Sequence, residues 1–251
     1  MCNHTGTEAN QRREVRTVKE TYIFMRHEIK YILNDAQRGI VEEAMRGRML
    51  EDEFGKSTIC SLYFDTPDFR LIRRSIEKPP YKEKMRLRSY GRAEDDDYVF
   101  LELKKKYNGV VYKRRLKASL QEACGYMEGS AALPASSQIG REIDYFRSFY
   151  PDLKPRVYIC YDRVAYYSLA DRSFRMTFDK NIRWRRSDLN LSSAPCGDPL
   201  LEADQSLLEI KTPGGIPLWL VAVLSKCGLH KANFSKYANA YMEMLLNGDA
   251  S

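Results

Sequence analysis

Four cations stand two residues apart in the stretch YKEKMRLRSY, residues 81–90: Lys82, Lys84, Arg86 and Arg88. A β-strand alternates its side chains between two faces, so a strand here places all four cations on one side and Met85 and Leu87 on the other. Ammonium and guanidinium groups held in a file can bind phosphate oxygens. The spacing therefore indicates a surface that binds an anion.

Carboxylates accompany the cations in other segments that alternate in the same way. These mixed polar faces are Arg26-Glu28-Lys30, Glu102-Lys104, Lys113-Arg115, Arg175-Thr177-Asp179 and Glu209-Lys211. A solvated sheet face could carry such residues, but exposed faces usually mix charges with Ser, Thr and Gln. Rows of like charge repel across strands unless an anion neutralises them, so we favour a functional cationic surface.

The carboxylates indicate which anion the surface binds. Glu28, Glu102, Asp179 and Glu209 would repel a nucleic-acid backbone, and the aromatic residues are not placed for base stacking, so no nucleic-acid partner is expected. Carboxylates beside Lys and Arg suit a polyphosphate that carries Mg²⁺ or Mn²⁺. The chain has neither G-x-x-x-x-G-K-[ST] nor G-x-G-x-x-G, so side chains would hold the phosphates.

The elements that would position these residues are mostly strands. Alternation predicts strands over 22–33, 59–66, 81–90, 155–168, 174–186 and 206–212, and a hairpin over 98–119. Helices are predicted over 35–51 (with Asn34 as the cap), 119–128, 139–150, 216–227 and 235–246. About eight antiparallel strands with a polar lining can close around a small ligand. The expected fold class is α+β, a closed antiparallel β-barrel with flanking helices.

The hairpin over 98–119 has the most definite register. Asn108-Gly109 between two β-rich runs is typical of a two-residue turn. This turn pairs Tyr107 with Val110, Lys104 with Lys113, Glu102 with Arg115, and Leu101 with Leu116.

Composition supports an anionic partner, because the 251-residue chain carries a formal net charge of +7. Its six cysteines lie far apart without C-x-x-C spacing, which is typical of reduced thiols in a cytoplasmic protein. Its three histidines are too few for a zinc site without cysteines nearby. Residues 1–20 are polar and are expected to be a disordered tail without a signal peptide. The longest apolar run, 216–224, is too short to span a membrane.

Nine motifs in order, over about residues 22–245, resemble the VTC-type polyphosphate polymerase domain, a branch of the triphosphate tunnel metalloenzyme (CYTH-like) superfamily. They are FMRHEIKY, SLYFDT, MRLRSYG, FLELKKK, YKRR, YDRVAY, FRMTFD, LLEIKT and FSKYANAY. The resemblance implies one catalytic domain over 21–248, a tunnel of antiparallel strands lined by basic residues. It implies transfer of the γ-phosphate of ATP to a growing polyphosphate chain, with release of ADP and a need for Mn²⁺ or Mg²⁺.

The resemblance also implies roles for individual residues. Lys236 would lie near the transferred phosphate, with Ser235 beside it, and Glu209 would bind the metal. The residues themselves place Ser235 as a cap where a helix begins at Lys236, and Glu28 as a second carboxylate for the metal. The phosphate ligands would be Lys30, Arg86, Arg88, Lys104, Arg163 and Arg175, and Lys84, Lys113 and Arg115 share their polar faces. Of these, Arg86 and Arg88 are assigned to catalysis together with Lys236.

Arg163 fits this assignment poorly. In a regular strand Arg163 lies on the same face as Val157, Ile159 and Tyr161, and that face is expected to be apolar. Either a bulge near Asp162 changes the register, or Arg156 is the residue that faces inward.

The first strand departs from the superfamily. Its hydrolase and cyclase branches usually carry E-x-E-x-K, whereas this chain has Arg26-His27-Glu28-Ile29-Lys30. The loss of one carboxylate favours polymer handling over two-metal hydrolysis. The alternatives are a tripolyphosphatase or nucleoside triphosphatase on the same fold, and a non-catalytic polyphosphate-binding module. Eukaryotic relatives add a phosphate-sensing domain and membrane helices, which this chain lacks, so a soluble, stand-alone cytoplasmic enzyme of open oligomeric state is expected.

Overall fold

The structure is a computed structural model that describes residues 23–24, 27–108, 110–132 and 137–248. Within these residues, the strands form one antiparallel sheet in the order β1-β7-β6-β5-β4-β8-β9-β11-β2. The long strands are β2 (His27–Asn34), β4 (Ser57–Asp65), β5 (Tyr81–Tyr90), β6 (Tyr98–Tyr107), β7 (Val110–Ser119), β8 (Lys154–Ser168), β9 (Arg175–Arg185) and β11 (Gln205–Thr212). Three short strands are added: β1 (Ile23–Phe24), β3 (Met49–Glu51) and β10 (Asp198–Pro199).

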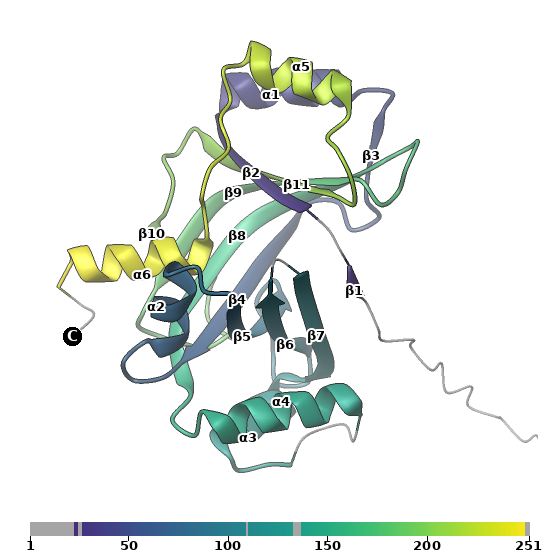
Figure 1. Cartoon of the computed structure of the whole chain (residues 1–251). Helices are drawn as coiled ribbons and strands as arrows, with labels where there is room; N and C mark the ends of the chain where they lie inside the picture. The colour runs from purple at the N-terminus through teal and green to yellow at the C-terminus, as the bar shows by residue number, and fades with distance from the viewer. Residues whose placement is uncertain (1–22, 25–26, 109, 133–136, 249–251) are drawn as a thin grey trace, which may run out of the picture.

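The sheet curves strongly, so that β2 comes round towards β6 and β7 (Figure 1). The side chain of Glu28 on β2 reaches Lys104 on β6, with 3.6 Å between Oε2 and Nζ. No backbone ladder in the described part of the chain joins β2 to β7. The antiparallel sheet with flanking helices is thus confirmed. The closed barrel is not confirmed, because within the described residues β1 pairs with β7 but β2 does not.

The hairpin has the predicted register throughout. Lys104 pairs with Lys113, Glu102 with Arg115 and Leu101 with Leu116. Asn108 adopts a positive φ of 44°, which a tight two-residue turn requires and which Asn tolerates.

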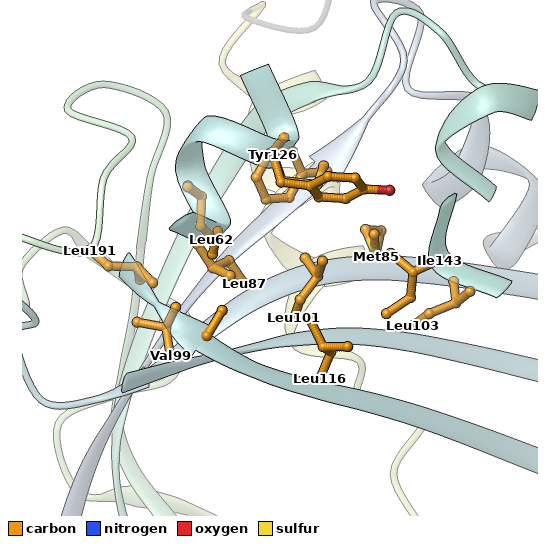
Figure 2. Packing of buried hydrophobic residues seen from close by; sticks show 14 of the residues in the cluster. Leu62, Met85, Leu87, Val99, Leu101, Leu103, Leu116, Tyr126, Ile143 and Leu191 are labelled. Carbon is orange, nitrogen blue, oxygen red and sulfur yellow. The ribbon is translucent and has the colours of Figure 1, made fainter. Parts of the chain in front are cut away.

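Helices cover the outer face of the sheet in two places. α1 (Asp35–Met45) and α5 (Leu218–Lys226) lie over β2, β9 and β11, and α3 (Leu120–Glu128) and α4 (Gln138–Phe149) lie over β4 to β7 (Figure 1). Figure 2 shows the second of these cores, in which Leu87, Leu101 and Leu116 meet Tyr126 and Ile143. Because the apolar side chains of each strand point outward to these helices, the residues between them point to the inner, concave face of the curved sheet.

One part of the inner face is also apolar. α6 (Lys236–Leu246) and α2 (Arg70–Ile76) pack there, and Tyr237 of α6 stacks on Tyr63 of β4 at 4.7 Å between ring centroids. The hydroxyl of Tyr237 donates to Asp65, a buried carboxylate that also accepts from the amides of Leu71 and Ile72. This apolar packing fixes the position at which α6 begins.

Several boundaries differ from the prediction. Asn34 is confirmed as the helix cap, where it forms a capping box with Gln37, but the helix predicted to reach residue 51 ends at Met45. The chain turns at Gly47, whose φ is 71°, and residues 49–51 pair with β8 instead. The helix α2 was not predicted, because its start is stabilised by Asp65 from the preceding strand and not by a local cap.

The predicted tail, residues 1–20, lies outside the described residues. Of the helices that the structure describes, none has the length and apolar character needed to cross a bilayer.

Candidate functional site

The cations of the opening stretch do share one face, and the neighbouring strands extend them into rows. Directly across β5, β6 and β7 lie Lys84, Lys104 and Lys113 in one row, and Arg86, Glu102 and Arg115 in the next. All six project to the inner side of the sheet, since the residues between them belong to the core beneath α3 and α4. Like charges in the first row repel directly, and this favours a bound anion.

Glu102 organises the second row. Its side chain is only 1% exposed and accepts from Arg86 Nε at 2.7 Å, Arg115 Nε at 2.7 Å and Lys113 Nζ at 2.7 Å. Burial opposes its ionisation, but the charges of Arg86, Arg88, Lys113 and Arg115 hold the pKa of Glu102 well below its ordinary value. The carboxylate is therefore ionised and fully occupied, and it orients two guanidinium groups side by side.

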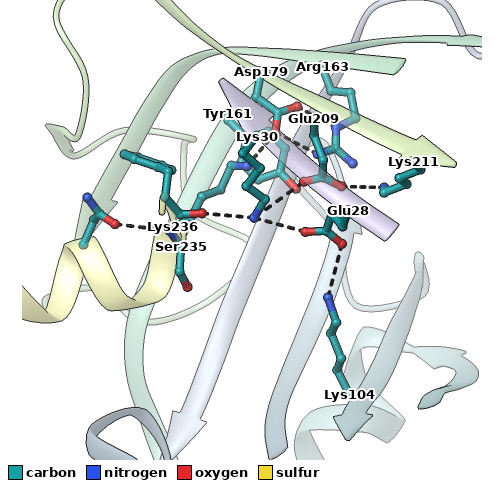
Figure 3. A network of polar contacts seen from close by, with 12 residues as sticks. Glu28, Lys30, Lys104, Tyr161, Arg163, Asp179, Glu209, Lys211, Ser235 and Lys236 are labelled. Atoms are coloured by element: carbon teal, nitrogen blue, oxygen red, sulfur yellow. Dashed lines mark hydrogen bonds and ion pairs between the residues drawn. The ribbon is translucent and has the colours of Figure 1, made fainter. Parts of the chain in front are cut away.

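A second buried carboxylate, Asp179 on β9, anchors the opposite wall (Figure 3). Arg163 binds it with two hydrogen bonds, Nε to Oδ1 at 2.6 Å and Nη2 to Oδ2 at 2.7 Å. Lys236, the first residue of α6, donates to Oδ2 at 2.5 Å and lies 4.3 Å from the centre of the Tyr161 ring. Burial raises the pKa of Asp179, but Arg163 and Lys236 outweigh it and lower that pKa.

Glu28, Lys30, Glu209 and Lys211 form the wall between these two groups (Figure 3). The Lys30 ammonium lies 3.1 Å from Glu28 and 3.8 Å from Glu209, and Lys211 lies 2.7 Å from Glu209. Burial disfavours both carboxylate charges, but the neighbouring lysines lower the pKa of Glu28 to about 2 and that of Glu209 well below its usual range. Both carboxylates are thus available as anionic oxygen ligands at neutral pH.

Ser235 connects α6 to the lysine row. Its hydroxyl accepts from Lys84 Nζ at 3.2 Å. The expected capping role is wrong, because Ser235 occupies the N-cap position without a side-chain hydrogen bond to the helix. The side chain of Asn239 accepts from the Ser235 amide instead, which leaves the Ser235 hydroxyl free to face Lys84.

Arg163 faces inward. A register shift does interrupt the β8–β9 pairing between Cys160 and Asp162, yet Tyr161 and Arg163 both contact the inner cluster. The same face of β8 is apolar at Val157 and Ile159, where α6 covers it, and polar at Arg163, beyond that cover. Arg156 lies elsewhere, with its guanidinium 5.7 Å from the ring of Phe69.

Arg175 lies at the rim of the cluster. It pairs across strands with Lys211, but its side chain is 41% exposed and its guanidinium donates to Asp52 at 3.0 Å. Arg88, in contrast, is buried against Ser61 and Tyr161. The structure therefore brings the predicted residues to one face, with Arg175 at its edge.

Sequence reasoning did not assign roles to Glu102, Asp179, Tyr161 or Lys211. Alternation placed Glu102 and Asp179 on polar faces, and the hairpin turn paired Glu102 with Arg115, but the contact of Asp179 with Lys236 joins residues far apart in the chain. The signal that could have found them is a lone carboxylate within a row of cations, because a buried carboxylate there must be paired.

Cations outnumber carboxylates in this network. The cations are Lys30, Lys84, Arg86, Arg88, Lys104, Lys113, Arg115, Arg163, Lys211 and Lys236, and the carboxylates are Glu28, Glu102, Asp179 and Glu209. The excess of positive charge suits a ligand with several negative charges. Guanidinium forks and ammonium groups bind phosphate oxygens in particular.

The residues present fit a divalent cation that arrives with phosphate. No group of three or more His, Cys, Asp and Glu able to hold a metal alone occurs in the described part of the chain. Mg²⁺, however, is usually bound by one or two carboxylates together with substrate phosphates and water. Glu28 and Glu209, on either side of Lys30, provide that pair.

Comparison with known proteins agrees with this fold. Subunit 4 of the vacuolar transporter chaperone complex of Trypanosoma brucei brucei is 27% identical over 220 residues, which is 73% of this chain. The chain spans only 28% of the length of that relative. A crystal structure of a Bacillus halodurans protein, described as a candidate adenylate cyclase, superposes with a TM-score of 0.51 at 14% identity, over 83% of this chain and 92% of that one. This likeness concerns the fold alone. The profile of the VTC domain matches residues 25–245, almost the whole described region, and the chain therefore belongs to the VTC domain family.

Proposed function

We propose that this protein is a metal-dependent polyphosphate polymerase that transfers the γ-phosphate of ATP to a polyphosphate chain and releases ADP. The observation that carries the proposal is the inner face itself, where cations from six long strands and from the start of α6 surround Glu28 and Glu209. Membership of the VTC domain family supports a polyphosphate-related role in phosphoryl transfer.

Arg86 and Arg115 bind the triphosphate of ATP in this proposal. Glu102 holds both guanidinium groups in one row across adjacent strands, so little side-chain entropy is lost when a phosphate binds. Lys104 and Lys113 add ammonium groups on the same side. The site thus offers a preorganised array of donors, which is what phosphoryl transfer chiefly requires.

Transfer takes place near Lys236. An oxygen of the terminal phosphate of the acceptor chain forms a bond to the γ-phosphorus, and the bond between that phosphorus and the β,γ-bridging oxygen breaks, so ADP leaves with the electron pair. The acceptor oxygen is already anionic, so no general base is needed. Lys236 and Arg163, held by Asp179, stabilise the negative charge on the transferred group.

Glu209 and Glu28 would hold Mg²⁺ or Mn²⁺ in this site. When bound, the metal would neutralise phosphate charge and help to orient the phosphates. Lys30, which balances both carboxylates, would remain close to the bound phosphates.

The proposal is tested by incubating purified protein with ATP and Mn²⁺, separating the products on a polyphosphate gel, and following ADP and free phosphate. A ladder of polyphosphate with equivalent ADP is expected. Free phosphate without a ladder would identify a triphosphatase on the same fold. Binding of ATP or tripolyphosphate without any product would identify a binding module. The Lys236→Ala variant should greatly slow formation of the ladder, and Lys231→Ala, at an exposed lysine five residues earlier, should not.

A further inference from the structure

The file of cations on β5 continues beyond the site described above. The next row towards the β6–β7 turn pairs Lys82 with Lys106, directly after the row of Lys84 and Lys104. Lys82 is half-buried and Lys106 is exposed. Neither forms an ion pair with a carboxylate of the described residues. Two successive rows of lysines therefore lead from the site to this end of the sheet.

Several cations crowd around Lys82. Its ammonium donates to the carbonyl oxygen of Ser75 at 3.1 Å, which holds it beside α2. Burial and the charges of Lys106, Lys78 and Lys104 lower the pKa of Lys82, as expected where several cations crowd together without an anion.

One carboxylate, Glu83, lies close to Lys82, but it points to the outer face. Glu83 accepts from the hydroxyls of Tyr81 and Tyr150. Arg74 of α2 lines a small hollow together with Lys82 and Glu83 at this end of β5. The local carboxylate is thus satisfied by tyrosines and leaves the lysine charges unmatched.

The other end of the same strands has the opposite charge. The connection between β5 and β6 contains four consecutive acidic residues, Glu94-Asp95-Asp96-Asp97, and all four are exposed. The amide of Asp97 donates to the carbonyl oxygen of Glu94, so these residues form a turn. Phe100 and Tyr90 pack edge to face beside this turn. An anionic chain is repelled at this acidic end and attracted at the lysine end.

The start of α6 joins the transfer site to the lysine rows. Lys236 contacts Asp179, and the adjacent Ser235 accepts from Lys84. From Arg86 to Lys82 the strand advances about 13 Å, since each residue adds about 3.3 Å. A chain that starts at Lys236 therefore meets Lys84 first and then Lys82 and Lys106.

We propose that long polyphosphate leaves the site along β5, over Lys84 and then between Lys82 and Lys106, and passes α2 at the end of the sheet opposite the acidic turn. This lysine track is a product-binding surface outside the transfer site. The inference rests on the proposed function, and it adds the direction of the chain and the residues that bind it after transfer.

The track is tested by binding phosphate chains of two lengths to the full chain. The dissociation constants of tripolyphosphate and of long-chain polyphosphate are measured over a range of salt concentrations for the wild type, Lys82→Gln, Lys106→Gln and the double variant. Lys117→Gln is the matched control, because Lys117 lies on the same face of the same hairpin but next to the acidic turn. Melting temperatures verify that each variant folds.

The expected result is a selective loss of affinity for long chains. Each track variant should bind long polyphosphate about threefold to tenfold more weakly, and its slope of log affinity against log salt should fall by about 0.7 for each lysine removed. Tripolyphosphate affinity should stay within about twofold, and Lys117→Gln should change neither value.

Three results would overturn the inference. Equal losses for both chain lengths would place the two lysines in the transfer site, and unchanged long-chain binding in the double variant would remove them from the path. A loss in Lys117→Gln alone would reverse the direction of the chain. Failure of the wild type to bind tripolyphosphate would instead overturn the proposed function on which the inference rests.

Discussion

The ammonium of Lys236 and the guanidinium of Arg163 bind the same carboxylate, Asp179, which is completely buried. Lys236 is 57 residues from Asp179 along the chain, so this contact attaches the first residue of α6 to β9. A buried carboxylate with two cations is stable only as a unit, because loss of one partner leaves an uncompensated charge.

Asp179→Asn should therefore destabilise the fold as well as the site. We expect the free energy of unfolding to fall by about 3–5 kcal/mol, measured by urea denaturation, since Arg163 and Lys236 both lose their counter-charge. Asp35→Asn is the control, because Asp35 pairs with Lys180 at 2.6 Å on the surface, where such a pair contributes about 0–1 kcal/mol. If the free energy of unfolding fell equally in the two variants, the buried contacts of Asp179 with Arg163 and Lys236 would stabilise the fold no more than a surface ion pair does.

Lys236→Ala tests the transfer step separately from binding. Turnover should fall by about 100-fold to 1,000-fold, which is the usual effect of removing one donor from a developing anion. Affinity for ATP should change by much less, because Arg86 and Arg115 keep their contacts with Glu102. Single-turnover kinetics with titrated ATP separate these two effects. A purely proportional loss of affinity would reassign Lys236 to substrate binding.

The inner face was predictable where register is local. Asn108 and Gly109 fix the hairpin, so the alternation of Glu102, Lys104 and Lys113 could be read directly from their positions. The cations of β5 followed from the same period of two.

The position of Arg163 could not be settled in this way. Its face of β8 changes from apolar to polar where α6 stops covering it, and that boundary depends on Tyr237 stacking on Tyr63. The anchors Glu102 and Asp179 were missed as site residues for a similar reason. Periodicity reveals which face a residue occupies, but it does not show that Glu102 is buried among several cations or that Lys236 reaches Asp179 from 57 residues away.

Glu209→Gln tests the metal. The amide keeps the shape of the side chain but loses the charge, so the Mn²⁺ concentration that gives half-maximal turnover should rise by about tenfold or more. The thermal stabilisation that Mn²⁺ gives in the presence of tripolyphosphate should fall in parallel. Glu43→Gln is the control, because Glu43 is exposed and pairs only with Arg46 in the described residues. An unchanged metal requirement in Glu209→Gln would remove Glu209 from the metal site.

Lys84 makes anion binding dependent on pH. Burial and the charges of Lys104, Lys82, Lys30 and Arg86 lower the pKa of Lys84 to about 7. Lys84 loses its charge as the pH rises through this value, so affinity for tripolyphosphate should fall between pH 6 and 8. Terminal phosphates titrate near pH 6 as well, and Lys84→Met therefore serves as the reference for that contribution. The variant should bind more weakly at pH 6 and lose less affinity as the pH rises.

The same pKa gives a stability effect of opposite sign in the free protein. Between about pH 7 and the ordinary lysine pKa near 10.4, the unfolded chain keeps the Lys84 proton that the folded chain has lost. Stability therefore rises with pH through this window and is lower below pH 7, where the crowded ammonium is charged in the folded state. Bound tripolyphosphate should cancel this trend, because it compensates the charge. Urea denaturation at pH 6 and 8, with and without tripolyphosphate, measures both effects, and identical pH slopes in wild type and Lys84→Met would exclude Lys84 as their origin.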